Sequence, residues 1–190
     1  MKRYTFRAAL LLFATLALAP ATARAQDETS SMLGRLNYEF SAGVMQGVGP
    51  QGNALRRGPA ISLNVHGESA TGMQLGVEGT YASSDDFFKT RFLSLGGIAR
   101  LSPMPEDYKV YVQLGAALYN VSYGNNDPGV VSPGNRTRPG GGFGLGFDVV
   151  QSDHYNVGAL LNYSGVVLAR SAARSYITAA ITLTFKPSGY

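Results

Sequence analysis

Apolar and polar residues alternate along eight segments of the chain, each about ten positions long. Successive side chains of a β-strand point to opposite faces, so a period of two predicts strands. The predicted strands are Arg35–Val44, Ala60–Glu68, Met73–Tyr81, Phe92–Leu101, Lys109–Tyr119, Gly142–Val149, Tyr155–Ser164 and Tyr176–Phe185. No segment shows a helical period of useful length.

The segments between these strands are expected to alternate in length, long first: Met45–Pro59, Ser69–Gly72, Ala82–Arg91, Ser102–Tyr108, Asn120–Gly141, Val150–His154 and Gly165–Ser175. Outer-membrane barrels have short periplasmic turns, longer outer loops, and both chain ends in the periplasm. The alternation of lengths therefore predicts the topology independently of the alternation of faces.

The two faces of the predicted strands differ in an unusual way. The apolar faces carry no Asp, Glu, Lys or Arg, and the opposite faces are mostly Ser, Thr, Asn and Gly. A soluble sheet normally presents Lys, Glu and Arg to water on its polar face. Small polar residues inside and bulky apolar residues outside predict an all-β fold, an eight-stranded antiparallel up-and-down transmembrane β-barrel.

The predicted inward face also holds charged groups of both signs. These are Arg35, Glu39, Glu68, Glu78, Arg100, Lys109 and Asp148, with His66 beside them. The interior of an eight-stranded barrel is only wide enough for side chains, so we expect these groups to pair across the lumen and leave no open pore. Glycines at 142, 144 and 146 are expected to leave room for Tyr111 and Tyr119.

The first residues have the pattern of a secretory signal, with Lys2 and Arg3 before the apolar stretch Ala8–Ala19 and small residues at 23 and 25. The stretch is too short for a membrane anchor. We expect residues 1–25 to be cleaved, 26–34 to form a periplasmic lead-in, 35–185 the barrel, and 186–190 a short tail.

The charge and the cysteine content exclude further classes. The net charge of +4 comes from 16 Lys and Arg against 12 Asp and Glu. Four basic residues lie in the predicted signal, so the mature chain balances at 12 against 12. The positive net charge of the full sequence therefore does not indicate a nucleic-acid partner. Cysteine is absent, so no disulfide supports the fold.

The signal, the eight strands, the short turns after Glu68, Leu101 and Val149 and the aromatic closing strand resemble the small outer-membrane barrels of the OmpX, Ail and OmpA-barrel kind. The resemblance implies the bacterial outer membrane as location and an assembly signal, read by the outer-membrane assembly machinery, in the closing strand: Ile177, Ala179, Ile181, Leu183 and Phe185. In this family the aromatic usually ends the chain, so either Phe185 or Tyr190 serves. Pro187 cannot donate to a strand ladder, which favours Phe185.

The resemblance implies a monomer with a structural or loop-mediated role, such as adhesion, host-factor binding through an extracellular protein partner, or envelope integrity. One alternative is a soluble exported lipocalin-like barrel, although a lumen of mixed charge argues against an apolar ligand. Another is a lipid A-modifying enzyme. The two histidines, His66 and His154, are both expected near the periplasmic end, and the His-x-Ser-Asn pattern is absent. We predict no catalytic residue, cofactor or metal.

The predicted outer loops and their margins are rich in basic residues: Arg56, Arg57, Lys89, Arg91, Arg136, Arg138, Arg170 and Arg174, against Asp85, Asp86 and Asp127. Arginine binds phosphate through two parallel hydrogen bonds, and lipopolysaccharide carries phosphates. We expect Arg56, Arg57, Arg136, Arg138, Arg170 and Arg174 to contact lipopolysaccharide. The alternative is that these side chains only keep the loops soluble.

Overall fold

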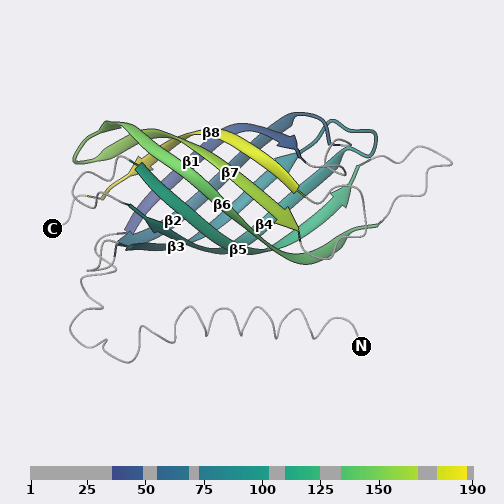
Figure 1. The fold of residues 1–190 in the computed structure, drawn as a ribbon, viewed down its shortest axis with the longest axis horizontal. Coiled ribbons are helices and arrows are strands. Elements are labelled where there is room, and N and C mark those ends of the chain that lie inside the picture. The colour runs from purple at the N-terminus through teal and green to yellow at the C-terminus, as the bar shows by residue number, and fades with distance from the viewer. Residues whose placement is uncertain are drawn as a thin grey trace, which may run out of the picture.

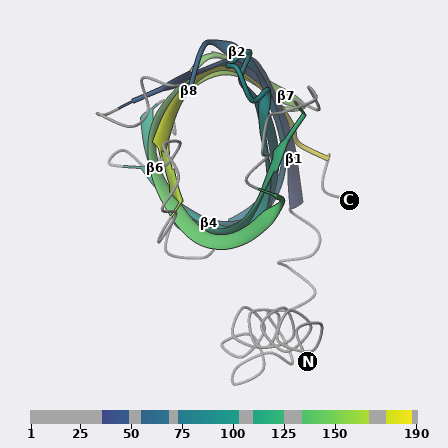
Figure 2. The same ribbon diagram turned by 90° about the vertical axis from the view of Figure 1, so that its right-hand side faces the viewer.

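The computed structural model describes residues 36–48, 55–68, 73–102, 110–124, 134–166 and 175–187. The strands form one closed barrel, in which each strand pairs antiparallel with the next and β8 pairs with β1 (Figures 1 and 2). Their bounds are β1 (Leu36–Gly47), β2 (Gly58–Glu68), β3 (Met73–Ser83), β4 (Thr90–Leu101), β5 (Val110–Tyr123), β6 (Arg136–Gln151), β7 (Tyr155–Val166) and β8 (Ser175–Phe185). The predicted fold class is confirmed. The signal and the lead-in lie outside the described residues and stay predictions.

The two ends of the barrel differ in the connections that they carry, and we call them the loop end and the terminal end. The loop end carries the connections β1–β2, β3–β4, β5–β6 and β7–β8, and the terminal end carries the other three connections with the start of β1 and the end of β8. No described segment is a helix long and apolar enough to cross a bilayer.

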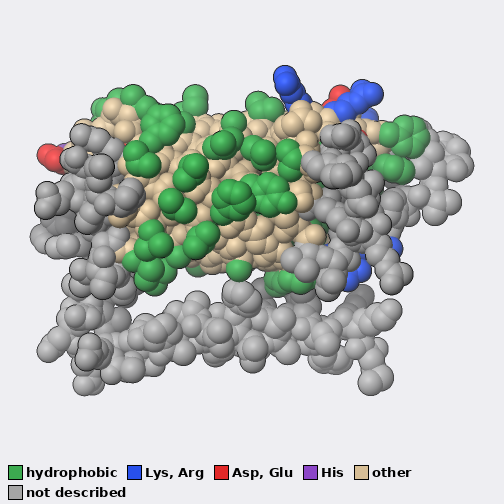
Figure 3. Space-filling model, in the orientation of Figure 1, with side chains coloured by type: hydrophobic (Ala, Val, Ile, Leu, Met, Phe, Trp, Pro, Cys, Tyr) green, Lys and Arg blue, Asp and Glu red, His purple; other side chains and the backbone are tan. Residues whose placement is uncertain are grey.

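The faces of the strands follow the predicted alternation, with the apolar side chains outside. Leu114 is 50% exposed and Ile181 68%, whereas the inward Gln113 and Thr182 are 2% and 1% exposed. Hydrophobic side chains spread over the middle of the barrel, and Lys and Arg gather at the loop end (Figure 3). A soluble barrel would bury its large apolar residues instead.

Aromatic side chains mark both margins of this apolar surface. At the terminal end Phe185 lies between Tyr38 and Tyr155 in the pairing register. Toward the loop end Phe143 packs on Tyr163, with ring centroids 5.3 Å apart. Tyr155 and Tyr163 are eight residues apart on β7, which spans about 26 Å at about 3.3 Å per residue. A strand tilt of about 40° reduces this to about 20 Å of height, close to the apolar band of about 25 Å between the aromatic girdles of membrane barrels.

Strand bounds were predicted well at the terminal end and poorly at the loop end. The predicted ends at Glu68, Leu101 and Phe185 match, whereas every strand continues further toward the loop end. For example, β6 begins at Arg136 and not at Gly142. The prediction that Asn120–Gly141 forms a loop is therefore wrong at both of its ends. Both faces can be polar beyond the apolar band, so the alternation of residue types fades while backbone pairing goes on.

The strict alternation of connection lengths is wrong at one place. The connection 84–89 between β3 and β4 is shorter than the connection 102–109 between β4 and β5. Asp86 closes the tighter turn, because its carboxylate accepts hydrogen bonds from Thr90 N at 2.7 Å and Thr90 Oγ1 at 2.8 Å. Lys89 adopts a left-handed φ of 48° there. Side-chain capping of this kind allows a short turn where the pattern predicts a long loop.

A bulge interrupts the end of β6. Asp148 pairs with Gly158 but Val150 pairs with Val157, so Val149 is an extra residue in the ladder. Val149 and Val150 are consequently both exposed, at 71% and 45%. Two neighbouring outward residues break the period of two, which explains why β6 was predicted to end at Val149 although it continues to Gln151.

The face assignment leads to a test by charge. Leu114→Arg or Leu145→Arg should lower the folding yield in lipid vesicles, because Arg at the bilayer midplane destabilises a barrel by about 2 to 4 kcal/mol. The uncharged control Leu114→Met should fold like the wild type. The yield is read from the shift in mobility between unheated and boiled samples, and equal yields for all variants would contradict the assignment.

Candidate functional site

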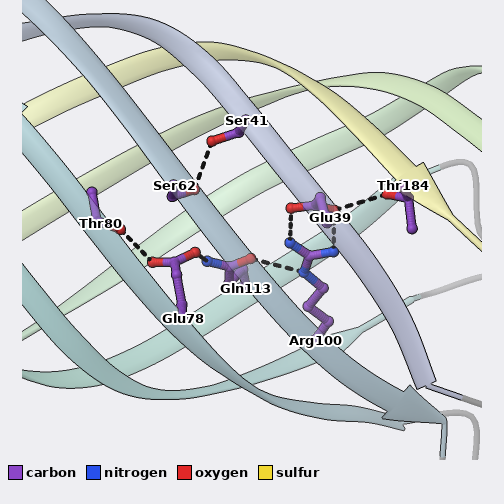
Figure 4. A network of polar contacts seen from close by, with 8 residues as sticks. All are labelled: Glu39, Ser41, Ser62, Glu78, Thr80, Arg100, Gln113 and Thr184. Carbon is purple, nitrogen blue, oxygen red and sulfur yellow. Dashed lines mark hydrogen bonds and ion pairs between the residues drawn. The ribbon is translucent and has the colours of Figure 1, made fainter.

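A bidentate ion pair crosses the lumen. Arg100 of β4 donates to both carboxylate oxygens of Glu39 on β1, through Nη1 and Nη2, at 2.6 Å each (Figure 4). The two side chains are 4% and 2% exposed. An ion pair this deeply buried is sustained only when the remaining donors and acceptors are also satisfied.

Neighbouring polar side chains extend the ion pair. Gln113 of β5 accepts from Arg100 Nε at 2.8 Å and donates to Glu78 of β3 at 3.1 Å. Thr80 donates to the other Glu78 oxygen at 3.2 Å, and Thr184 of β8 donates to Glu39 at 3.1 Å. The resulting network joins β1, β3, β4, β5 and β8. Gln113 was missed because only charged residues were considered, and its inward position was the only signal.

Tyr111 and Tyr119 both lie over inward glycines. The Tyr111 ring lies 4.6 Å below the Arg100 guanidinium carbon, in a cation–π contact. A Cβ at Gly146 would clash with that ring, so the predicted role of Gly146 fits the geometry. The Tyr119 ring, however, covers Gly140 and not Gly142, because it leans one inward position toward the terminal end.

Among the described residues, the other predicted lumen charges lie outside the hydrogen-bond network of Arg100. Asp148 accepts a hydrogen bond from Asn156 Nδ2 at 2.7 Å, and His66 is 2% exposed. Arg35 and Lys109 lie outside the described residues, as does the side chain of Glu68 at the end of β2. The structure thus brings Glu39, Glu78 and Arg100 into one network, with Asp148 and His66 beside it.

A small polar cavity lies next to this network. Its volume is about 60 Å³, and its lining includes Arg100, His66, Tyr111, Asp148 and Asn156. At about 10 to 15 Å³ per water, this volume corresponds to a few water molecules. Ligand pockets are usually about 300 Å³ or larger. The geometry therefore favours packing of the lumen over a ligand pocket.

The loop end of the lumen is filled by apolar side chains, of which only Tyr119 was expected to fill the interior. We call these residues the apolar plug: Met45, Leu55, Ala60, Ala82, Phe92, Tyr119, Val121, Val166 and Tyr176. Phe92 and Tyr176 pack with ring centroids 4.9 Å apart. Leu55, from the β1–β2 connection, is 1% exposed. Met45, Ala82, Val121 and Val166 lie at strand ends beyond the predicted bounds and Leu55 lies in a connection, so the inward direction of these five was not predicted.

The closing strand presents its predicted assembly residues outward. Phe185 is 52% exposed and the odd positions before it share its face. Directly after it, Lys186 N donates to His154 O at 2.8 Å and Lys186 Nζ donates to Ser152 O at 3.2 Å. The beginning of the tail is therefore fixed to the β6–β7 turn.

The basic residues of the loop end do not share one face. Arg136 and Arg138 lie within β6, opposite the interior residues Val121 and Tyr119. Arg57 Nε instead donates to Gln46 on the outward face of β1, at 3.2 Å. Arg56 is exposed, while Arg170 and Arg174 lie outside the described residues.

No family model matches the chain, and no curated protein matches it. Its structure is similar to that of Neisserial surface protein A, with a TM-score of 0.58 and 18% identity over 80% of this chain and 97% of that one. Other similar structures are the N-terminal β-barrel domain of Pseudomonas aeruginosa OprF (TM-score 0.48, 15% identity, 79% and 96% covered) and the Yersinia pestis outer membrane protein Ail (0.47, 10%, 79% and 98%). The likeness to Neisserial surface protein A shows a shared barrel fold. Among the described residues, no group of three or more His, Asp or Glu side chains could hold a metal.

The ion pair makes a quantitative prediction about stability. Arg100→Met leaves the Glu39 carboxylate buried without its cation, which should lower the free energy of unfolding by about 3 to 5 kcal/mol. The double variant Glu39→Met with Arg100→Met should lose less, because no uncompensated charge remains. Urea unfolding in lipid vesicles measures both. A double variant at least as unstable as the single one would show that the cost comes from lost packing.

Proposed function

We propose that this protein is a monomeric barrel of the bacterial outer membrane, closed to solutes, with a structural or loop-mediated interaction role. The observation that carries the proposal is the outward apolar surface. Large apolar side chains are exposed on every strand from β1 to β8, for example Leu63 at 58%, Leu95 at 55% and Phe143 at 56%. Soluble monomers rarely expose contiguous apolar patches beyond a few hundred Å², whereas a barrel in lipid requires such a band.

The filled lumen supports a role without solute transport. The Arg100 network blocks the terminal half of the interior and the apolar plug blocks the loop end. Among the described residues, the cavity of about 60 Å³ beside the network is small and polar, which does not suit the apolar ligand of a lipocalin-like barrel. A catalytic role has little support, because His66 is enclosed in the lumen and His154 lies on a turn at the terminal end, away from the loop end where an outer-leaflet substrate would be met.

Two kinds of partner fit the loop end. Its arginines suit the phosphates of lipopolysaccharide, which is the first proposed contact. The second is an extracellular protein, and Phe87 favours it. This side chain is 65% exposed in the β3–β4 connection and packs edge-on against Phe88, with centroids 5.2 Å apart. Phe88 in turn packs on Tyr123 at 6.2 Å, and supported aromatic side chains of this kind often anchor protein interfaces.

Fractionation tests the proposed location. The protein expressed in a Gram-negative host should appear in the outer-membrane fraction, and an unheated sample should migrate differently in a denaturing gel from a boiled one. The physical reason is that closure pairs both edges of the sheet, so the barrel has no open edge at which detergent could begin to unfold it. Recovery in the soluble periplasmic fraction, with a heat-modifiable fold retained, would instead support the lipocalin-like alternative.

The assembly signal has a matched test that compares the last residue of β8 with a residue of the tail. Phe185→Ser should reduce insertion into the outer membrane strongly, whereas Tyr190→Ser should have little effect, because the apolar register ends at Phe185. Both variants exchange one aromatic residue for serine near the C-terminus. The amount of heat-modifiable protein in the outer-membrane fraction is measured, and a larger loss with Tyr190→Ser would assign the signal to Tyr190.

A further inference from the structure

The pairing register divides the basic residues of the loop end into two sets. On β6, Arg136 pairs with Val121 and Arg138 with Tyr119, and both of these β5 residues belong to the apolar plug. The register of β5 and β6 has no irregularity along this stretch. Since paired residues of neighbouring strands point to the same face, Arg136 and Arg138 lie on the side of the barrel mouth and not on the side of the surrounding lipid.

Lys89 and Arg91 belong to the opposite face. Thr90 and Phe92 are each 1% exposed toward the interior, and Arg91 between them is exposed. A Cβ added to Gly124, the residue directly after β5, would lie 3.4 Å from Lys89 Cβ and 3.5 Å from Arg91 Nη2. The two cationic side chains therefore flank the same point on the outside of the barrel.

Arg57 belongs to the same outward face, directly before β2, and its side chain is directed toward β1. Its Nε donates to Gln46 Oε1 at 3.2 Å, and the neighbours of Gln46 on β1, Met45 and Gly47, are buried. The bond uses one of the five donors of the guanidinium. Asp85 is exposed nearby in the β3–β4 connection. With Asp86, whose buried carboxylate bonds to Thr90 in the same connection, two carboxylates face three cations, and the group is still positive.

The height of the outward set suits lipid headgroups. Arg91 pairs with Ser83, and the next outward pair toward the terminal end is Leu93 with Tyr81, at the margin of the apolar surface. Two residues along a tilted strand correspond to about 5 Å of height. The cations thus lie directly above the apolar band, where the phosphates of the outer leaflet are placed.

We propose that Arg57, Lys89 and Arg91 form a lipid-side site for the phosphates of lipopolysaccharide, and that Arg136 and Arg138 take no part in it. The inference rests on the proposed outer-membrane location and names the residues of its lipid contact. It removes Arg136 and Arg138 from the six arginines that the sequence analysis expects to contact lipopolysaccharide. It adds Lys89 and Arg91, which that analysis counts among the basic residues of the loop end but not among the six contacts.

Two double variants of equal charge test the assignment. Lys89→Gln with Arg91→Gln and Arg136→Gln with Arg138→Gln each remove two positive charges at the loop end. Binding of diphosphorylated lipid A to the detergent-solubilised full-length barrel is measured by native mass spectrometry, with dephosphorylated lipid A as the ligand control. A heat-modifiability gel confirms that each variant is folded.

The lipid-side double variant should weaken binding of diphosphorylated lipid A about tenfold, and adding Arg57→Gln should weaken it further, since each exposed contact contributes modestly. The mouth-side double variant should change it less than about twofold, and Asp85→Asn should strengthen it. Equal losses from both double variants would overturn the assignment while leaving a phosphate contact of the outer-membrane barrel intact. A larger loss of binding in the mouth-side double variant would also overturn the assignment. It would indicate that phosphates bind over the barrel mouth, as those of a soluble polyanion would. Unchanged binding in every variant would remove the lipid contact, while the proposed location would still stand on fractionation.

Discussion

Closure of the sheet is the constraint on which the rest of this structure depends. Backbone N–H and C=O groups find no water in the hydrocarbon region, so a spanning sheet must pair its two edges with each other. Here β1 and β8 pair from Tyr38 with Phe185 to Gly47 with Tyr176. This pairing sets Phe185 between Tyr38 and Tyr155, so the closing strand completes one aromatic margin as it completes the backbone ladder.

Closure with eight strands also fixes the interior, which is too narrow for a channel and must be filled by side chains. The protein fills it in two ways. Near the terminal end a bidentate Arg100–Glu39 pair and Gln113 connect strands across the lumen, and every polar group of the ion pair has a partner. Toward the loop end Phe92, Tyr176 and their neighbours pack as an ordinary apolar core. The polar half depends on directional bonds and the apolar half on shape, so mutations should be felt differently in the two halves.

The sequence predicts those parts of the fold that the surroundings impose position by position. The apolar face is one such part, as are the strand bounds at the terminal end, where Glu68 and Leu101 end their strands as expected. What it could not predict depends on three-dimensional neighbours. The bulge at Val149 follows from local pairing, and Gln113 acquires its role only because Glu78 and Arg100 reach it from other strands. Much of the plug was missed because Met45, Ala82, Val121 and Val166 lie beyond the predicted strand bounds, where the alternation of residue types has already faded.

Within the apolar band, successive side chains of a strand point alternately outward and into the lumen. This alternation continues beyond the band toward the loop end. The strands extend past the apolar surface, so a residue at the loop end still belongs to one face of a paired ladder. Arg91 and Arg138 are both basic residues of the rim, yet one lies above Leu93 and Tyr81 while the other lies opposite Tyr119 of the plug. A count of charges in the loops treats the two as equivalent. The strand register distinguishes them, because an electrostatic contact with a headgroup depends on whether the charge lies on the outer or the inner face of the barrel. The chemistry of the loop end is thus decided by the strand pairing that also closes the barrel.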